Sequence, residues 1–161
     1  MAVIAWRIVK EKYIKNAFSG EGAAKGGGRW NSMGSRVVYA SSSLALATLE
    51  AQVHLPSYKQ LKKYKCLSIS FDETWIFTPA ALPDGWDLVP PTTISQSFGD
   101  QWLSLGELAV LSIYSFSMLL ESWRLWGRCC ENDSIHQSKT DRLIIPNVCI
   151  VLALSDSEIR I

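Results

Sequence analysis

Clustered and alternating apolar positions along the chain predict short strands. Residues 3–9 are mostly β-branched or aromatic, and Arg7 projects from them. Residues 66–71 alternate between apolar and polar side chains, as a half-buried strand does. The remaining short apolar runs continue this pattern. We expect strands at residues 3–9, 37–40, 66–71, 108–114 and 143–154.

Helical segments separate these strands. Ser41-Ser42-Ser43 is a helix start signal, and in residues 44–54 the side chains of Leu46, Leu49 and Val53 form one apolar stripe. Two further helical segments are expected, at residues 13–18 and 96–105. Because strands and helices do not alternate regularly, the pattern favours an α+β domain. The length of 161 residues predicts a single domain over residues 1–161.

Two segments predict irregular structure. Residues 19–28 are rich in glycine, and Gly26-Gly27-Gly28 ends this stretch, so we expect a loop with unusual backbone conformations. Residues 74–93 contain four of the six prolines of the chain and are expected to form a looped excursion.

The balance of basic and acidic side chains bears on whether the chain binds nucleic acid. The chain has 16 basic and 15 acidic side chains, for a net charge of +1, which argues against direct binding of nucleic acid by neutralisation of phosphates. The lysines between Lys59 and Lys65 are interpreted as a solvated surface. Seven Trp, five Tyr and five Phe exclude disorder for most of the chain.

Two sequence patterns predict the cellular compartment and the absence of a metal site. The apolar residues 144–154 are too short for a membrane-spanning helix, and Arg7 interrupts any signal-peptide core, so we expect a cytoplasmic protein without membrane contact. The cysteines show no C-x-x-C pair, which predicts no metal site and no disulfide scaffold. We expect buried, reduced thiols at Cys66, Cys129, Cys130 and Cys149.

Arg29, Tyr39 and Glu50 are the candidate chemical residues. An arginine beside flexible glycine N–H groups can bind a phosphate through a forked contact, and a tyrosine offers a flat face to a ring. A carboxylate can bind a ribose hydroxyl and stabilise positive charge at the anomeric carbon. Each residue also has an ordinary explanation: a surface arginine, a core tyrosine and an exposed helical glutamate.

Competing motifs are rejected. Gly26-Gly27-Gly28-Arg29 is neither a P-loop nor a dinucleotide-binding G-x-G-x-x-G fingerprint. Neither Cys66 nor Ser115 has a histidine partner by local motif, and a lone histidine such as His54 or His136 is more often structural than catalytic.

Several motifs together resemble one protein family. The chain is similar to RES-domain proteins, which are toxins of bacterial toxin–antitoxin pairs and usually occur beside an Xre-like antitoxin. The similarity covers roughly half of the chain, densely over residues 5–55 and less so over 95–115. It rests on Arg7-Ile8-Val9, Ser19-Gly20-Glu21-Gly22-Ala23, Gly27-Gly28-Arg29-Trp30-Asn31-Ser32-x-Gly34, Val37-Val38-Tyr39-x-Ser41, Leu44-Ala45-x-x-x-Leu49-Glu50, Val53-His54-Leu55 and Ser97-Phe98-Gly99-Asp100-x-Trp102.

The resemblance implies a compact α+β fold like that of ADP-ribosyltransferase toxins, with small mixed or antiparallel sheets and flanking helices. It implies that NAD is consumed as a substrate, by phosphorolysis or hydrolysis of the nicotinamide–ribose bond, without a resident cofactor. The acceptor of the ADP-ribose could be inorganic phosphate, water or a protein side chain.

The resemblance also implies roles for individual residues. Arg29, with the backbone at Gly28, would hold the NAD phosphates, Tyr39 would pack on the nicotinamide side, and Glu50 would orient the ribose. Arg7 would line the same pocket as a second cation. The family serine falls at Ser115, although Tyr114 stands where the family usually has proline.

Residues 120–161 depart from the family pattern. The usual N-P-x-H segment is replaced by Glu131-Asn132-Asp133-Ser134-Ile135-His136. Because a pocket needs its supporting residues, two hypotheses remain open: an active NAD-consuming toxin, and a decayed toxin that only binds an antitoxin.

Overall fold

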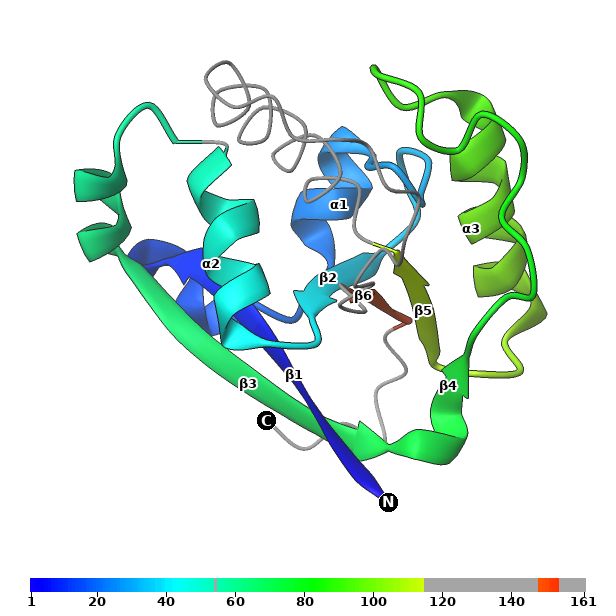
Figure 1. Cartoon of the computed structure of the whole chain (residues 1–161), viewed down its shortest axis with the longest axis horizontal. Coiled ribbons are helices and arrows are strands. Elements are labelled where there is room, and N and C mark those ends of the chain that lie inside the picture. The colour runs from blue at the N-terminus through cyan, green and yellow to red at the C-terminus, as the bar shows by residue number, and fades with distance from the viewer. Residues whose placement is uncertain (54, 115–147, 154–161) are drawn as a thin grey trace, which may run out of the picture.

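The computed structural model describes residues 1–53, 55–114 and 148–153, which form a six-stranded sheet and flanking helices (Figure 1). The strand order is β3-β1-β2-β6-β5-β4, and neighbours are antiparallel except for the parallel pair β4–β5. The strands are β1 (Ala2–Lys10), β2 (Val37–Ser41), β3 (Tyr64–Asp72), β4 (Ile76–Phe77), β5 (Val110–Tyr114) and β6 (Val148–Ala153).

Helices α1 (Glu21–Gly26), α2 (Leu44–Val53) and α3 (Thr93–Leu105) lie toward the top of the view in Figure 1, above the strands. The Oγ atom of Ser43 accepts a hydrogen bond from the Leu46 N–H group at 3.2 Å and caps the start of α2. Gly106, with φ of 62°, ends α3 in the left-handed conformation. Short 3₁₀ segments are η1 (Glu11–Asn16), η2 (Tyr58–Lys63) and η3 (Glu73–Trp75).

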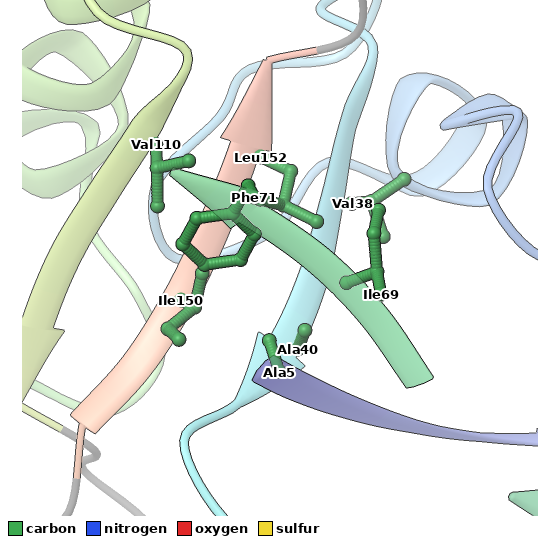
Figure 2. Packing of buried hydrophobic residues seen from close by; sticks show 8 residues of the cluster. All are labelled: Ala5, Val38, Ala40, Ile69, Phe71, Val110, Ile150 and Leu152. Carbon is green, nitrogen blue, oxygen red and sulfur yellow. The ribbon is translucent and has the colours of Figure 1, made fainter. Parts of the chain in front are cut away.

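The sheet turns back on itself, so that β3 crosses over β2 and β6 with apolar side chains between them (Figure 2). This packing requires alternation, and β3 supplies it: Ile69 and Phe71 are buried, whereas Ser68 and Ser70 are exposed. The first core cluster contains Ala5, Val38, Ala40, Ile69, Phe71, Val110, Ile150 and Leu152.

A second core lies on the other face of β2, β6 and β5. Val37, Leu111 and Val151 alternate with members of the first cluster along their strands and are almost fully buried. Helix α3 covers this face with Trp102, and Trp30 joins it from the turn before β2. This second core supports the residues that carry the candidate chemistry.

The α+β class and the expected strands are confirmed over the described residues. Strands β1, β2, β3 and β5 lie where the pattern predicts them, and β6 occupies part of residues 143–154, of which 143–147 and 154 lie outside the described residues. Helices α2 and α3 are confirmed as well. The prediction did not include the short strand β4.

Three local predictions are wrong. The expected loop at residues 19–28 contains helix α1, because Glu21 to Lys25 can form one turn despite the flanking glycines. Leu49 is 43% exposed while Leu46 is 2% exposed, so Leu46 and Leu49 do not share the buried face of α2. That face instead contains Leu46 and Ala47.

The third wrong prediction concerns cysteine. Cys66 is an exposed free thiol, because it alternates with the inward-facing side of β3. The side chains of the other three cysteines lie outside what the structure describes. Over the described ranges, no helix has both the length and the apolar character needed to cross a membrane, and no three metal-ligating side chains form a group.

Candidate functional site

A tight turn before β2 presents Arg29. The N–H group of Gly28 donates to the carbonyl oxygen of Asn31 at 2.9 Å, which closes the turn and leaves Arg29 and Trp30 at its tip. Gly27 precedes it with φ of 66°, a conformation that favours glycine. The Nε2 atom of Gln96 donates to the Gly28 carbonyl oxygen at 3.0 Å and ties the turn to α3.

Residues of the motif in α3 contact this turn directly. Asp100 accepts from the Ser32 N–H group at 3.1 Å and from the Ser35 hydroxyl at 2.7 Å. The Phe98 ring meets the Trp30 ring edge-on, with centroids 5.9 Å apart. Two of the motifs that carry the family resemblance, residues 27–34 and 97–102, therefore pack against each other, and Arg29 belongs to the first of them.

Arg29 connects the turn to the loop that precedes α3. Its Nη1 atom donates to the carbonyl oxygens of Trp86 at 2.6 Å and Leu88 at 2.9 Å. The rings of Trp30 and Trp86 stack with centroids 5.7 Å apart. The hydrogen bonds of Arg29 and this ring contact therefore both hold the loop. Partial burial lowers the pKa of Arg29, while Asp87 and Tyr39 oppose that shift.

Tyr39 lies on β2 with its hydroxyl group fixed. The hydroxyl donates to Oδ1 of Asn31 at 2.7 Å and accepts from the Trp30 N–H group at 3.1 Å. A β-carbon built on Gly28 would lie 2.5 Å from the same hydroxyl oxygen, so only glycine fits there. The half-buried ring packs against the second core.

Glu50 is held over the end of β2. The buried hydroxyl of Ser41 donates to its Oε2 atom at 3.0 Å. Ser41 and Tyr39 are two residues apart on one strand, so their side chains share a face at a spacing of about 7 Å. The half-buried carboxylate of α2 is therefore bound to a residue that shares its face of β2 with Tyr39.

The side chain of Arg7 starts from the other face of the sheet. The register of β1 pairs Ala5 with Ile69 and Trp6 with Ser41, so Arg7 begins on the first-core face, away from Ser41. Its Nη1 atom donates to the backbone carbonyl oxygen of Tyr39. Burial lowers the pKa of Arg7, and within the described ranges its buried Nε atom has no hydrogen-bond partner.

The structure thus brings Arg29, Tyr39 and Glu50 to one side of β2, and Gly28 lies against the Tyr39 hydroxyl. Arg7 donates to the backbone of this site, at the carbonyl oxygen of Tyr39, and Ser115 lies outside the described residues. A groove of about 420 Å³ between Pro83 and α3 contains none of the predicted site residues.

Sequence reasoning missed two supporting residues, Asn31 and Ser41. Both stand inside motifs that carry the resemblance, so the signal was present, but a polar residue in a turn or at a strand end does not reveal its partner. Their hydrogen bonds to Tyr39 and Glu50 become visible only when the turn, β2 and α2 are assembled.

Comparisons with known proteins agree with the motifs. Residues 4–140 match the RES domain family. A relative from Sphingobium sp. (strain YBL2), named Prs ADP-ribosylating toxin, is 38% identical over 122 residues, which cover 71% of this chain and 76% of the relative.

Two further relatives are each named Toxin Res. The one from Photorhabdus laumondii subsp. laumondii is 34% identical over 105 residues, covering 64% of this chain and 67% of the relative. The one from Yersinia enterocolitica is 30% identical over 103 residues, covering 63% and 68%. The chain belongs to the RES domain family.

Proposed function

We propose that this chain is a toxin that consumes NAD by breaking the bond between nicotinamide and ribose. Three relatives named as toxins support the toxin assignment. The observation that carries the chemistry is the Glu50 carboxylate, held by Ser41 on the same face of β2 as Tyr39, with the Arg29 cation nearby.

Each of the three side chains fits one part of the dinucleotide. The Nη1 atom of Arg29 donates to two carbonyl oxygens, and phosphate oxygens are stronger acceptors for the guanidinium. The Tyr39 ring offers a flat face to the nicotinamide. The Glu50 carboxylate accepts a hydrogen bond from a ribose hydroxyl and stabilises positive charge on the sugar.

The reaction cleaves one bond and forms another. The bond between C1′ of the ribose and the ring nitrogen breaks, and nicotinamide leaves with the bonding electron pair as a neutral molecule. The ribose passes through an oxocarbenium-like state. Inorganic phosphate or water then bonds to C1′, and an attacking water molecule releases its proton to solvent.

A second candidate acceptor is a protein side chain. It is favoured by one observation, the relative named as an ADP-ribosylating toxin. Both versions share the first bond cleavage and differ in what bonds to C1′. We also propose, from the family, an Xre-like antitoxin as the partner of this chain.

Release of nicotinamide from NAD tests the proposal. Purified protein is incubated with NAD, with and without inorganic phosphate, and free nicotinamide and the ADP-ribose product are measured. Glu50→Gln keeps the shape of the side chain and removes its charge, so we expect nicotinamide release to fall by about a hundredfold or more. Exposed Glu107→Gln is the matched control and should release nicotinamide at the rate of the unmodified chain.

The outcomes separate the candidates. Release that requires phosphate identifies phosphorolysis, and release without phosphate identifies hydrolysis. Release that occurs only with added cell protein, with label from NAD on that protein, identifies protein ADP-ribosylation. No release under any condition contradicts the proposal and leaves the decayed, antitoxin-binding protein. Equal release by Glu50→Gln removes Glu50 from the mechanism.

A further inference from the structure

The side chain of Asn31 is fully buried and makes four hydrogen bonds. Its Nδ2 atom lies 3.0 Å from the carbonyl oxygens of Ala23 and Ser32 and 3.1 Å from that of Ser35, and its two N–H groups are shared among these three acceptors. Its Oδ1 atom accepts from the Tyr39 hydroxyl at 2.7 Å. The contact with the Tyr39 hydroxyl is not needed to close the turn.

The orientation of this amide is determined by its partners. Carbonyl oxygens can only accept, so the atom that faces them must be the nitrogen, and the oxygen must face Tyr39. The Tyr39 hydroxyl in turn uses its proton on Asn31 and a lone pair on the Trp30 N–H group. Two hydrogen bonds therefore fix the hydroxyl oxygen, and the long axis of the ring cannot swing aside without breaking one of them.

Gly28 completes the same arrangement. A β-carbon at this position would lie 2.7 Å from Oδ1 of Asn31, in addition to its clash with the Tyr39 hydroxyl. The backbone of Gly28, next to Arg29, therefore lies in close contact with the side chains of Asn31 and Tyr39. One buried amide sets the ring of Tyr39 and, through the closed turn, the place from which Arg29 projects.

We propose that Asn31 is a positioning residue for the dinucleotide site: it holds the ring of Tyr39 at the place where the ring stacks on the nicotinamide. This inference rests on the proposed function. It also assigns the work of Tyr39 to the face of its ring, because the hydroxyl proton is already donated to Asn31. Tyr39 is then neither the acid nor the base of the reaction.

A kinetic double-mutant cycle tests this inference in the full chain. Asn31→Leu removes the acceptor with little change of volume, and Tyr39→Phe removes the hydroxyl alone. Each single variant should raise KM for NAD by about tenfold and change kcat by less than about threefold, as loss of one ground-state contact does. The double variant should be no worse than either single variant, because both remove the same hydrogen bond.

Two results overturn the inference. One is KM increases that multiply in the double variant, which would mean that Asn31 acts without Tyr39. The other is a large fall of kcat in Tyr39→Phe with unchanged KM and a lost limb of the pH–rate profile, which would make the hydroxyl reactive. If Asn31→Leu does not fold, Tyr39→Phe alone tests the inference. This variant keeps the three contacts that Nδ2 of Asn31 makes with carbonyl oxygens.

A matched control separates positioning from general weakening of the turn. Ser35→Ala loses a hydrogen bond to Asp100 in the same turn without touching Tyr39, and should lower the unfolding temperature while keeping KM for NAD. A KM increase in Ser35→Ala equal to that of Asn31→Leu also overturns the inference. Absence of nicotinamide release by the unmodified chain is a different result, since it contradicts the proposed function itself.

Discussion

The carbonyl oxygen of Trp30 lies directly against the Cα atom of Gly99, and α3 has no room for a β-carbon at this position. The contact joins the turn that carries Arg29 to the helix that supports it. It also explains why glycine stands between Phe98 and Asp100, which both bind the same turn.

Gly99→Ala should destabilise the protein although alanine is the better helix former. The methyl group would collide with backbone rather than with a flexible side chain, so the turn or the helix must shift. We expect a loss of about 2 kcal/mol in the free energy of unfolding and a fall of about 6 °C in the unfolding temperature.

Gly22→Ala is the matched control for this substitution. Gly22 lies inside α1, and a β-carbon there would have no atom within 4 Å. Its unfolding temperature should stay the same or rise slightly, by the helix propensity of alanine. A Gly99→Ala variant as stable as Gly22→Ala would show that the seam between α3 and the turn is loose.

Asp100 should make stability depend on pH in the acid range. Partial burial opposes its ionisation, but the hydrogen bonds from Ser32 and Ser35 outweigh burial and lower the pKa of Asp100. A carboxyl with a lowered folded pKa stabilises the protein fully above its unfolded pKa of about 3.9. This contribution is lost as the pH falls through the lower, folded pKa.

Asp100→Asn should therefore lower the free energy of unfolding at pH 7 by about 1 kcal/mol, a value that allows for solvent screening. It should also flatten the decline below about pH 4. Chemical denaturation at a series of pH values measures both effects. Ser35→Ala, which removes one of the donors, should give an intermediate curve. Parallel curves for Asp100→Asn and the unmodified chain would contradict the assigned cause.

Arg29→Lys should separate charge from geometry. Lysine keeps the positive charge but cannot present a planar fork to two acceptors, so KM for NAD should rise by about tenfold. The carbonyl oxygens of Trp86 and Leu88 lose their donor, and amide hydrogen exchange in residues 84–88 should become faster.

Arg36→Lys, at an exposed position, is the control for Arg29→Lys and should change neither KM nor exchange. Faster exchange with an unchanged KM would leave Arg29 as a structural clamp for the loop. Unchanged exchange would show that the stacked rings of Trp30 and Trp86 hold the loop without Arg29.

The sequence predicted strands well because their signal is local. Ile69 and Phe71 face the core and alternate with polar neighbours, and this alternation is visible in the residue order. The buried face of α2 was predicted less well, since Glu50 takes a half-buried place that an apolar stripe would give to Leu49. The Glu50 carboxylate faces β2 and accepts a hydrogen bond from Ser41.

The site was predictable as a set of residue types but not as an arrangement. Arg29, Tyr39 and Glu50 stand in motifs, whereas the partners that fix them come from distant segments, such as the Trp86 and Leu88 carbonyl oxygens. Backbone acceptors leave no trace in the side-chain pattern. Contacts of this kind are decided by the tertiary fold.

The place of β6 in the sheet has a consequence for synthesis of the protein. β2 ends at Ser41 and β6 begins at Val148, yet β6 pairs with both β2 and β5 at the centre of the strand order. Such distant pairing is slow to form. A ribosome must reach β6 before Tyr39 gains its neighbour Val151, so a nascent chain that ends before β6 lacks the strand that joins β2 to β5.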